Sequence, residues 1–137
     1  MTLPSKTPTT RYRTSNPYET RFGFSRAVRK GPHIFVAGTT STDPVTGNVL
    51  YPKSAYDQTM QIFREIIKAI ESLGGTKDDV VRMRIYVANA DSEDGQKAGD
   101  AFKEVFGTVG PAATMIFGMK LMNPDMKIEI EADAVVL

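Results

Sequence analysis

Residues 54–88 read SAYDQTMQIFREIIKAIESLGGTKDDVVRMRIYVA, and this stretch decides the fold. Apolar residues recur at three- and four-residue spacing in its first part, which predicts an amphipathic helix over residues 54–73. Gly74 and Gly75 end that helix, because glycine readily adopts the left-handed conformation that follows many helix C-termini. The last part predicts a strand over residues 80–88, with one face formed by Val81, Met83, Ile85 and Val87.

The flanking sequence supplies the other elements of the same domain. Residues 22–28 and 33–37 predict two short strands joined at Gly31-Pro32, a dipeptide typical of turns. A second helix is predicted over residues 92–106, ended by Gly107, and two more strands over residues 112–119 and 127–137. The order β-β-α-β-α-β-β predicts an α+β fold, a mixed sheet with two helices on one face.

The second face of this sheet needs a cover from outside the subunit, since two helices can cover only one face. This uncovered face is expected to carry Met115 and Phe117, or their neighbours on the opposite side of the same strand. Exposed apolar side chains favour self-association, so we expect a homotrimer with a cyclic axis.

The composition excludes several classes of protein. The chain has 137 residues, 17 basic and 16 acidic, and no basic stripe that would mark a nucleic-acid partner. It contains no cysteine and a single histidine, His33, so thiolate chemistry is excluded and no metal site is expected. The apolar runs are too short to span a bilayer, so no membrane association is expected.

The first residues differ in composition from the rest. Residues 1–16 predict a disordered or extended tail, and residues 17–137 a single domain. Residues 1–15 lack the hydrophobic segment of a secretory signal, which favours a cytoplasmic protein. The absence of acidic residues before Glu19 leaves a mitochondrial presequence as the alternative.

Several strings in this order resemble the Rid (YjgF-like, RidA) family of reactive-intermediate deaminases. They are FSRAV at 24–28, HIFVAGT at 33–39, LGG at 73–75, DDVV at 78–81, GPAAT at 110–114 and KIEIEA at 127–132. The resemblance implies a chorismate-mutase-like domain and a barrel-like homotrimer with a small-molecule cleft between subunits. It also implies hydrolysis of imines or enamines, with no metal or organic cofactor. Some members of the family are described as ribonucleases.

The sequence departs from the family pattern at two positions. The family signature places an arginine after Pro-Ala, whereas Ala113 follows Pro111-Ala112 here. Arginine pairs with a carboxylate through two parallel hydrogen bonds, and alanine offers no donor. Phe24 stands where the family often has a tyrosine that faces the cleft, so a hydroxyl is also lost.

The family carboxylate that positions or activates water matches Glu129, which we expect to be the catalytic residue. Glu131 lies two positions on and shares its strand face. Either carboxylate could instead form an ion pair between subunits or lie at a surface edge.

Other residues are candidates for substrate binding around this carboxylate. Arg26 and Arg84 are the cations that would replace the missing arginine, with ordinary ion pairs as the alternative. Thr39 and Thr114 would place hydroxyls in the cleft, beside the positions of Phe24 and Ala113. His33 is expected at the start of a strand on the surface, and residues 17–21 form a loop that either closes the cleft or is an exposed turn.

The resemblance, together with the retained Glu129, implies a small-molecule hydrolase or lyase that acts on an imine, enamine or related reactive intermediate in a specialised catabolic or biosynthetic step. Because Ala113 replaces the arginine, turnover of 2-aminoacrylate-type imines is expected to be weak or absent. The alternative is a non-catalytic trimer that binds a small-molecule ligand in the same cleft. A nuclease ranks third, since no basic and aromatic residues interleave along a groove.

Overall fold

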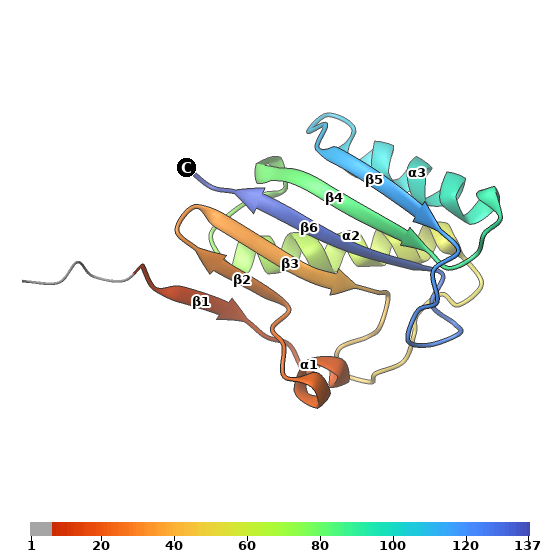
Figure 1. Cartoon of the computed structure of the whole chain (residues 1–137), viewed down its shortest axis with the longest axis horizontal. Helices are drawn as coiled ribbons and strands as arrows, with labels where there is room; N and C mark the ends of the chain where they lie inside the picture. The colour runs from red at the N-terminus through yellow and green to blue at the C-terminus, as the bar shows by residue number, and fades with distance from the viewer. Residues whose placement is uncertain (1–6) are drawn as a thin grey trace, which may run out of the picture.

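Six strands form one mixed sheet in the computed structural model, which describes residues 7–137 (Figure 1). The order across the sheet is β1-β2-β3-β6-β4-β5, and β4 and β5 run parallel while the other neighbours are antiparallel. The elements in chain order are β1 (Thr9–Tyr12), α1 (Pro17–Phe22), β2 (Ala27–Lys30), β3 (His33–Thr39), α2 (Ala55–Ser72), a 3-10 turn (Lys77–Asp79), β4 (Val80–Val87), α3 (Ser92–Phe106), β5 (Ala112–Phe117) and β6 (Ile128–Val135).

The two long helices cover one face of the sheet, as the sequence predicted (Figure 1). Ser54 caps α2 by accepting a hydrogen bond from the backbone N–H of Asp57. Phe63 of α2 meets Phe106 of α3 edge-on, with ring centroids 4.9 Å apart. Ile66 lies fully buried in the core between helix and sheet. The predicted α+β fold, with both long helices on one side, is therefore confirmed.

The N-terminal region differs from the prediction. Residues 9–12 form β1, which pairs with β2 at the edge of the sheet, so the domain begins before residue 17. Residues 17–22 form the short helix α1 where a loop was expected, because Asn16 caps the helix and Pro17 occupies its first turn. The strand expected over residues 22–28 begins only at Ala27, so Phe24 and Arg26 lie in a loop. Residues 1–6 lie outside the described residues.

One side-chain assignment within the sheet needs correction, and the structure decides between the two alternatives for the strand at residues 112–119. The register between β4 and β6 shifts between Val80 and Arg82, so Val80 is buried and Val81 is exposed, the reverse of the expected alternation. Met115 packs against the core, and a Cβ at Gly95 of α3 would meet both Met115 and Phe117. The uncovered face of β5 therefore carries their neighbours on the opposite side of the strand.

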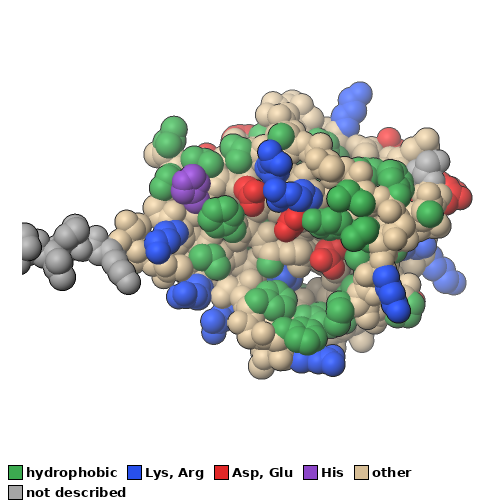
Figure 2. All heavy atoms as spheres, viewed as in Figure 1, with side chains coloured by type: hydrophobic (Ala, Val, Ile, Leu, Met, Phe, Trp, Pro, Cys, Tyr) green, Lys and Arg blue, Asp and Glu red, His purple; other side chains and the backbone are tan. Residues whose placement is uncertain are grey.

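The uncovered face is partly charged and partly apolar, and Figure 2 shows it toward the viewer. Arg84 lies within 3.5 Å of Glu131 and 3.8 Å of Asp133, with all three side chains about one third exposed. Phe35 and Ile116 on the same face are 51% and 40% exposed. This mixture of charges and apolar groups distinguishes the uncovered face from the dry face under the helices.

Candidate functional site

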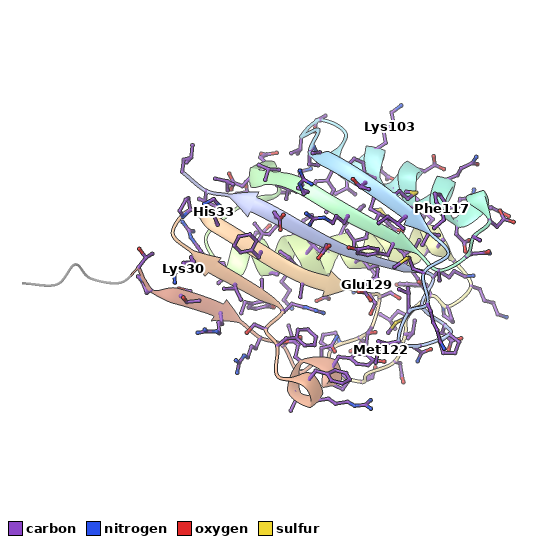
Figure 3. The ribbon with its side chains drawn as sticks, viewed as in Figure 1. Lys30, His33, Lys103, Phe117, Met122 and Glu129 are labelled. Atoms are coloured by element: carbon purple, nitrogen blue, oxygen red, sulfur yellow. The ribbon has the colours of Figure 1, made fainter. Side chains whose placement is uncertain are left out.

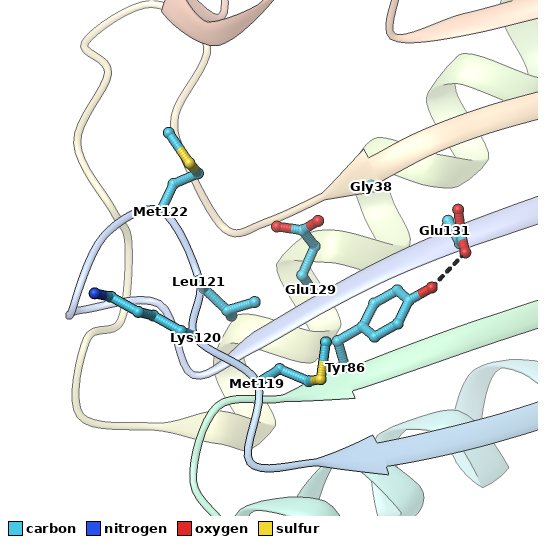
Figure 4. A pocket seen from close by; sticks show the side chains of 8 residues that line it. All are labelled: Gly38, Tyr86, Met119, Lys120, Leu121, Met122, Glu129 and Glu131. Atoms are coloured by element: carbon cyan, nitrogen blue, oxygen red, sulfur yellow. Dashed lines mark hydrogen bonds between the residues drawn. The ribbon is translucent and has the colours of Figure 1, made fainter.

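Two cavities meet at Glu129. The larger is an open cleft of about 550 Å³, lined by Gly38 of β3, Tyr86 of β4, Glu129 and Glu131 of β6, and residues 119–122 (Figure 4). The smaller is a chamber of about 160 Å³, with walls from α1, the loop after it, and the segment between β5 and β6. Gly38, Met122 and Glu129 line both cavities, so Glu129 stands where they join.

The alternation of β6 brings the Glu129 side chain to this position. Ile128 and Ile130 face the core and are fully buried, so Glu129 points to the opposite side of the sheet. Gly38 lies against it on β3, and a Cβ at Gly38 would overlap the Glu129 carboxylate. The absence of a side chain at residue 38 is therefore what gives this carboxylate its space.

Burial raises the pKa of Glu129 above its ordinary value, and the negative charge of Glu131 adds to this rise while Arg26 opposes it. Among the residues that the structure describes, no hydrogen bond or ion pair involves the Glu129 carboxylate. Figure 4 also shows Lys120 directed away from it. A half-buried carboxylate with a raised pKa and free oxygens is a better proton acceptor than an ordinary carboxylate.

Arg26 is a buried cation on the chamber side of Glu129. Its side chain is held by a 2.7 Å hydrogen bond from Nη2 to the carbonyl oxygen of Gly38, and the guanidinium lies 5.4 Å from the ring centre of Phe24. Arg26 is only 5% exposed, and its Nε has no partner among the described residues. Burial lowers the pKa of Arg26, and the negative charges of Glu19 and Glu129 raise it by a smaller amount.

Glu131 has partners where Glu129 has none. The Tyr86 hydroxyl donates to Glu131 over 2.6 Å (Figure 4). Arg84 contributes an ion pair to the same carboxylate. The same hydrogen bond raises the pKa of Tyr86. The two carboxylates of the cleft therefore differ, because neighbouring side chains fix Glu131, whereas Glu129 is available to a ligand.

The structure brings together three of the predicted site residues, Phe24, Arg26 and Glu129, at the chamber. Arg84 lies farther along the uncovered face. Thr39 does not line either cavity, since it is 1% exposed and its hydroxyl donates to the carbonyl of Ala37 over 2.8 Å.

Ala113 and Thr114 are separated from Glu129 within one subunit. Ala113 pairs with Met83 on β4, whereas Glu129 pairs with Tyr86 three positions farther along that strand. His33 is exposed at the start of β3, as expected, and stacks near Phe35. Within residues 7–137, no group of three potential ligands is placed to hold a metal ion.

Some lining residues were missed at the sequence level, among them Asn16, Phe22 and Met126. Tyr18 also lines the chamber, and it belongs to residues 17–21, the segment expected either to close the cleft or to form an exposed turn. The pair Asn16-Pro17 is typical of a helix start, and it is the sequence signal that predicts α1. No local signal marks Met122 and Met126, which line the chamber together with Glu129. Figure 3 shows Met122 on the irregular connection that precedes β6, on the same side of the molecule as Glu129.

The family model described as Endoribonuclease L-PSP matches residues 14–136, nearly the whole chain. The chain belongs to the YjgF/L-PSP/RutC family. An uncharacterized protein of Streptomyces coelicolor is 33% identical over 125 residues, which cover 90% of each chain. A RutC family protein of Pyrococcus horikoshii is 32% identical over 111 residues, covering 81% of this chain and 85% of the relative.

Solved structures of this family share its fold. A member of the YjgF/YER057c/UK114 family from Mycobacterium tuberculosis superposes with a TM-score of 0.82 at 35% identity, covering 94% of this chain and all of that one. The E. coli YjgF gene product gives a TM-score of 0.74 at 27% identity, covering 96% and 98%. The family predicted from the sequence is therefore confirmed. In the described part of this YjgF-family chain, no helix combines the length and hydrophobicity needed to cross a bilayer.

Proposed function

We propose that this chain is a small-molecule hydrolase or lyase that acts on an imine, enamine or related reactive intermediate. The observation that carries the proposal is the Glu129 carboxylate, half-buried and without a protein partner where the cleft and the chamber join. A small molecule in either cavity would contact this carboxylate. A cation or a water molecule would complete its missing interactions.

The chemistry assigned to Glu129 is that of a general base. It accepts a proton from water while the water oxygen bonds to the carbon of a protonated C=N group, whose nitrogen becomes a neutral amine. The proton on Glu129 then passes to that amine, the C–N bond breaks, and Glu129 takes the hydroxyl proton as ammonia leaves behind a carbonyl compound. The raised pKa of Glu129 suits a group that must both take up and release a proton.

The substrate differs from a simple 2-imino acid in this proposal. Residue 113 offers no guanidinium, and Arg26 is already engaged with Gly38 and Phe24. An anionic substrate would therefore lack a guanidinium at residue 113, and Arg26 could offer only the donors that the Gly38 carbonyl oxygen leaves free. We expect weak or absent turnover of 2-aminoacrylate-type imines and a preference for a specialised substrate.

A homotrimer is part of the proposal. The sheet face that carries Phe35 and Ile116 is uncovered in the single subunit, and burying it would follow from association. Ala113 and Thr114 lie away from Glu129 within one subunit, so they would join a cleft only if a partner brought its own copies there. Light scattering should give three times the mass of the chain, and a stable monomer at micromolar concentration would contradict the trimer.

A non-catalytic ligand-binding trimer is the second candidate, and the alanine at residue 113 and Phe24 favour it. A nuclease is disfavoured, because the cleft lining carries two carboxylates, Glu129 and Glu131, against one cation, Lys120, where a polyanion would need cations. The deciding experiment supplies imines without a carboxylate, generated in situ from primary amines by an amine oxidase, and measures the rate at which they disappear. Accelerated hydrolysis supports the enzyme, while binding without acceleration for any imine supports the ligand-binding alternative.

A further inference from the structure

The chamber beside Glu129 is lined mostly by apolar side chains. Tyr18 and Phe22 come from α1, Phe24 from the next loop, and Met122 and Met126 from the segment before β6. The volume is about 160 Å³. An apolar protein cavity of about 150 Å³ stays dry and binds benzene. The chamber therefore has the size of a single six-membered ring.

The polar groups in the chamber wall are largely engaged with the protein itself. Asn16 accepts a hydrogen bond from the backbone N–H of Tyr18, and the Thr40 hydroxyl pairs with that of Thr42 at 2.7 Å. Arg26 is held by the Gly38 carbonyl oxygen and is nearly fully buried. The wall groups that keep free hydrogen-bonding atoms are Arg26, at Nε, and the Glu129 carboxylate, while five of the lining side chains are apolar and suit an apolar group.

The chamber and the cleft are two cavities that join at Glu129, because Glu129, Gly38 and Met122 line both of them. A molecule whose reacting atom lies beside Glu129 therefore extends one group into the chamber and another into the open cleft. The chamber wall sets five apolar side chains beside the opposite charges of Arg26 and Glu129, so its lining favours the uncharged end of the molecule.

We propose that the chamber binds an uncharged apolar group of the substrate, about the size of a phenyl ring, while the polar end lies in the cleft. The position of the reacting carbon rests on the function proposed above, whereas the fit of the ring rests on the chamber alone. The substrate class is thus an imine or enamine with a ring-sized or branched apolar substituent.

Binding of two neutral probes tests this proposal on the full-length chain. Phenylacetamide and acetamide share a polar head and differ by the ring that the chamber would accept. We expect phenylacetamide to bind at least tenfold more tightly, since each buried methylene adds about fourfold in affinity. Equal affinities of the two amides in a calorimetric titration would overturn the proposal.

Methionine methyl resonances report the position of the ring without any substitution. The methyl group of Met126, a chamber residue, should shift on adding phenylacetamide because an aromatic ring changes the local field. The methyl group of Met60, which packs against the core and lines neither cavity, is the internal control. A shift at Met60 with none at Met126 would place the ring elsewhere and overturn the proposal.

A matched pair of variants removes one wall of the chamber. Phe22 and Phe117 are 56% and 41% exposed, but only Phe22 lines the chamber. Phe22→Ala should weaken phenylacetamide binding at least fivefold and leave acetamide unchanged, while Phe117→Ala should change neither by more than twofold. Circular dichroism checks that both variants are folded, and equal effects of the two variants would contradict the proposal.

Turnover separates this proposal from the proposed function. If imines are hydrolysed, a phenyl-bearing imine should have a kcat/KM at least tenfold above that of a methyl-bearing one. Turnover without that preference would overturn the chamber proposal. Tight phenylacetamide binding with no imine turnover would support the chamber and overturn the hydrolase.

Discussion

The two faces of β6 differ in what determines their residues. Toward α2, Ile128 and Ile130 are fully buried and pack in a dry core. Toward the opposite side, Glu129 and Glu131 alternate with them and line a cleft. Packing against the helices explains the first set completely, whereas nothing in the core requires a carboxylate in the second. The comparison shows which residues serve folding and which are available for chemistry.

The largest effect on stability is expected from a substitution on the core face of β6. Ile130→Ala leaves a cavity beneath α2 and should lower the free energy of unfolding by about 2–5 kcal/mol. Urea unfolding followed by circular dichroism, at one fixed protein concentration, measures this loss. Glu131→Ala on the opposite face is the control and should cost about 1 kcal/mol or less. Similar losses in the two variants would remove the distinction between the faces.

Glu129→Gln tests the chemical role of the opposite face. The amide keeps the shape of the side chain but cannot act as a base, so turnover of the preferred imine should fall about 10²-fold or more. Glu131→Gln is the matched control, because Glu131 is already engaged by Tyr86 and Arg84. Initial rates of both variants give the comparison. A larger loss in Glu131→Gln would exchange the roles of the two carboxylates.

The sequence predicted the core face far better than the cleft. The helical spacing of Ile62 and Ile66 and the alternation around Ile130 report burial directly, so α2 and β6 were found close to their true bounds. The chamber joins α1, a loop and a distant connection, and no local pattern encodes that meeting. Thr39 shows the limit clearly, since its hydroxyl looked available in the sequence but is bonded to Ala37 inside the core.

Gly38→Ala tests whether the space for Glu129 matters. The new Cβ would overlap the carboxylate and push it from its position, so turnover should fall about tenfold, the scale of a small misplacement. Gly99→Ala is the control, because nothing lies within 4 Å of a Cβ at that helical position. Gly99→Ala should keep the full rate and raise the free energy of unfolding by about 0.5–1 kcal/mol. Full activity in Gly38→Ala would show that Glu129 tolerates displacement.

Arg84→Met probes the charged cluster on the uncovered face. The side chains of this cluster, Arg84, Glu131 and Asp133, are about one third exposed in the single subunit. Their ion pairs should therefore add less than about 1 kcal/mol to the free energy of unfolding, and this contribution should weaken with added salt. Urea unfolding at low and high salt measures the contribution. A loss of about 3 kcal/mol or more would indicate that a partner subunit buries the cluster.

The smallest effect is expected in the pH dependence of stability. Burial raises the pKa of Glu129 above its ordinary value of 4.5, so the folded chain holds this proton more tightly than the unfolded chain. The contribution of this carboxyl to stability is therefore fully present below pH 4.5 and is lost as the pH rises through the folded pKa.

Glu129→Gln removes that loss, because the amide stays neutral at every pH. Its Tm should exceed that of the parent chain slightly at pH 7, and the difference should vanish as the pH falls below 4.5, the ordinary pKa. Calorimetry at matched protein concentration measures both values. A lower Tm for Glu129→Gln at pH 7 would mean that a cation stabilises the ionised carboxylate. Arg26 is the cation within the subunit that opposes the rise in pKa, so that result would make the ion pair, and not the free carboxylate, the main role of Glu129.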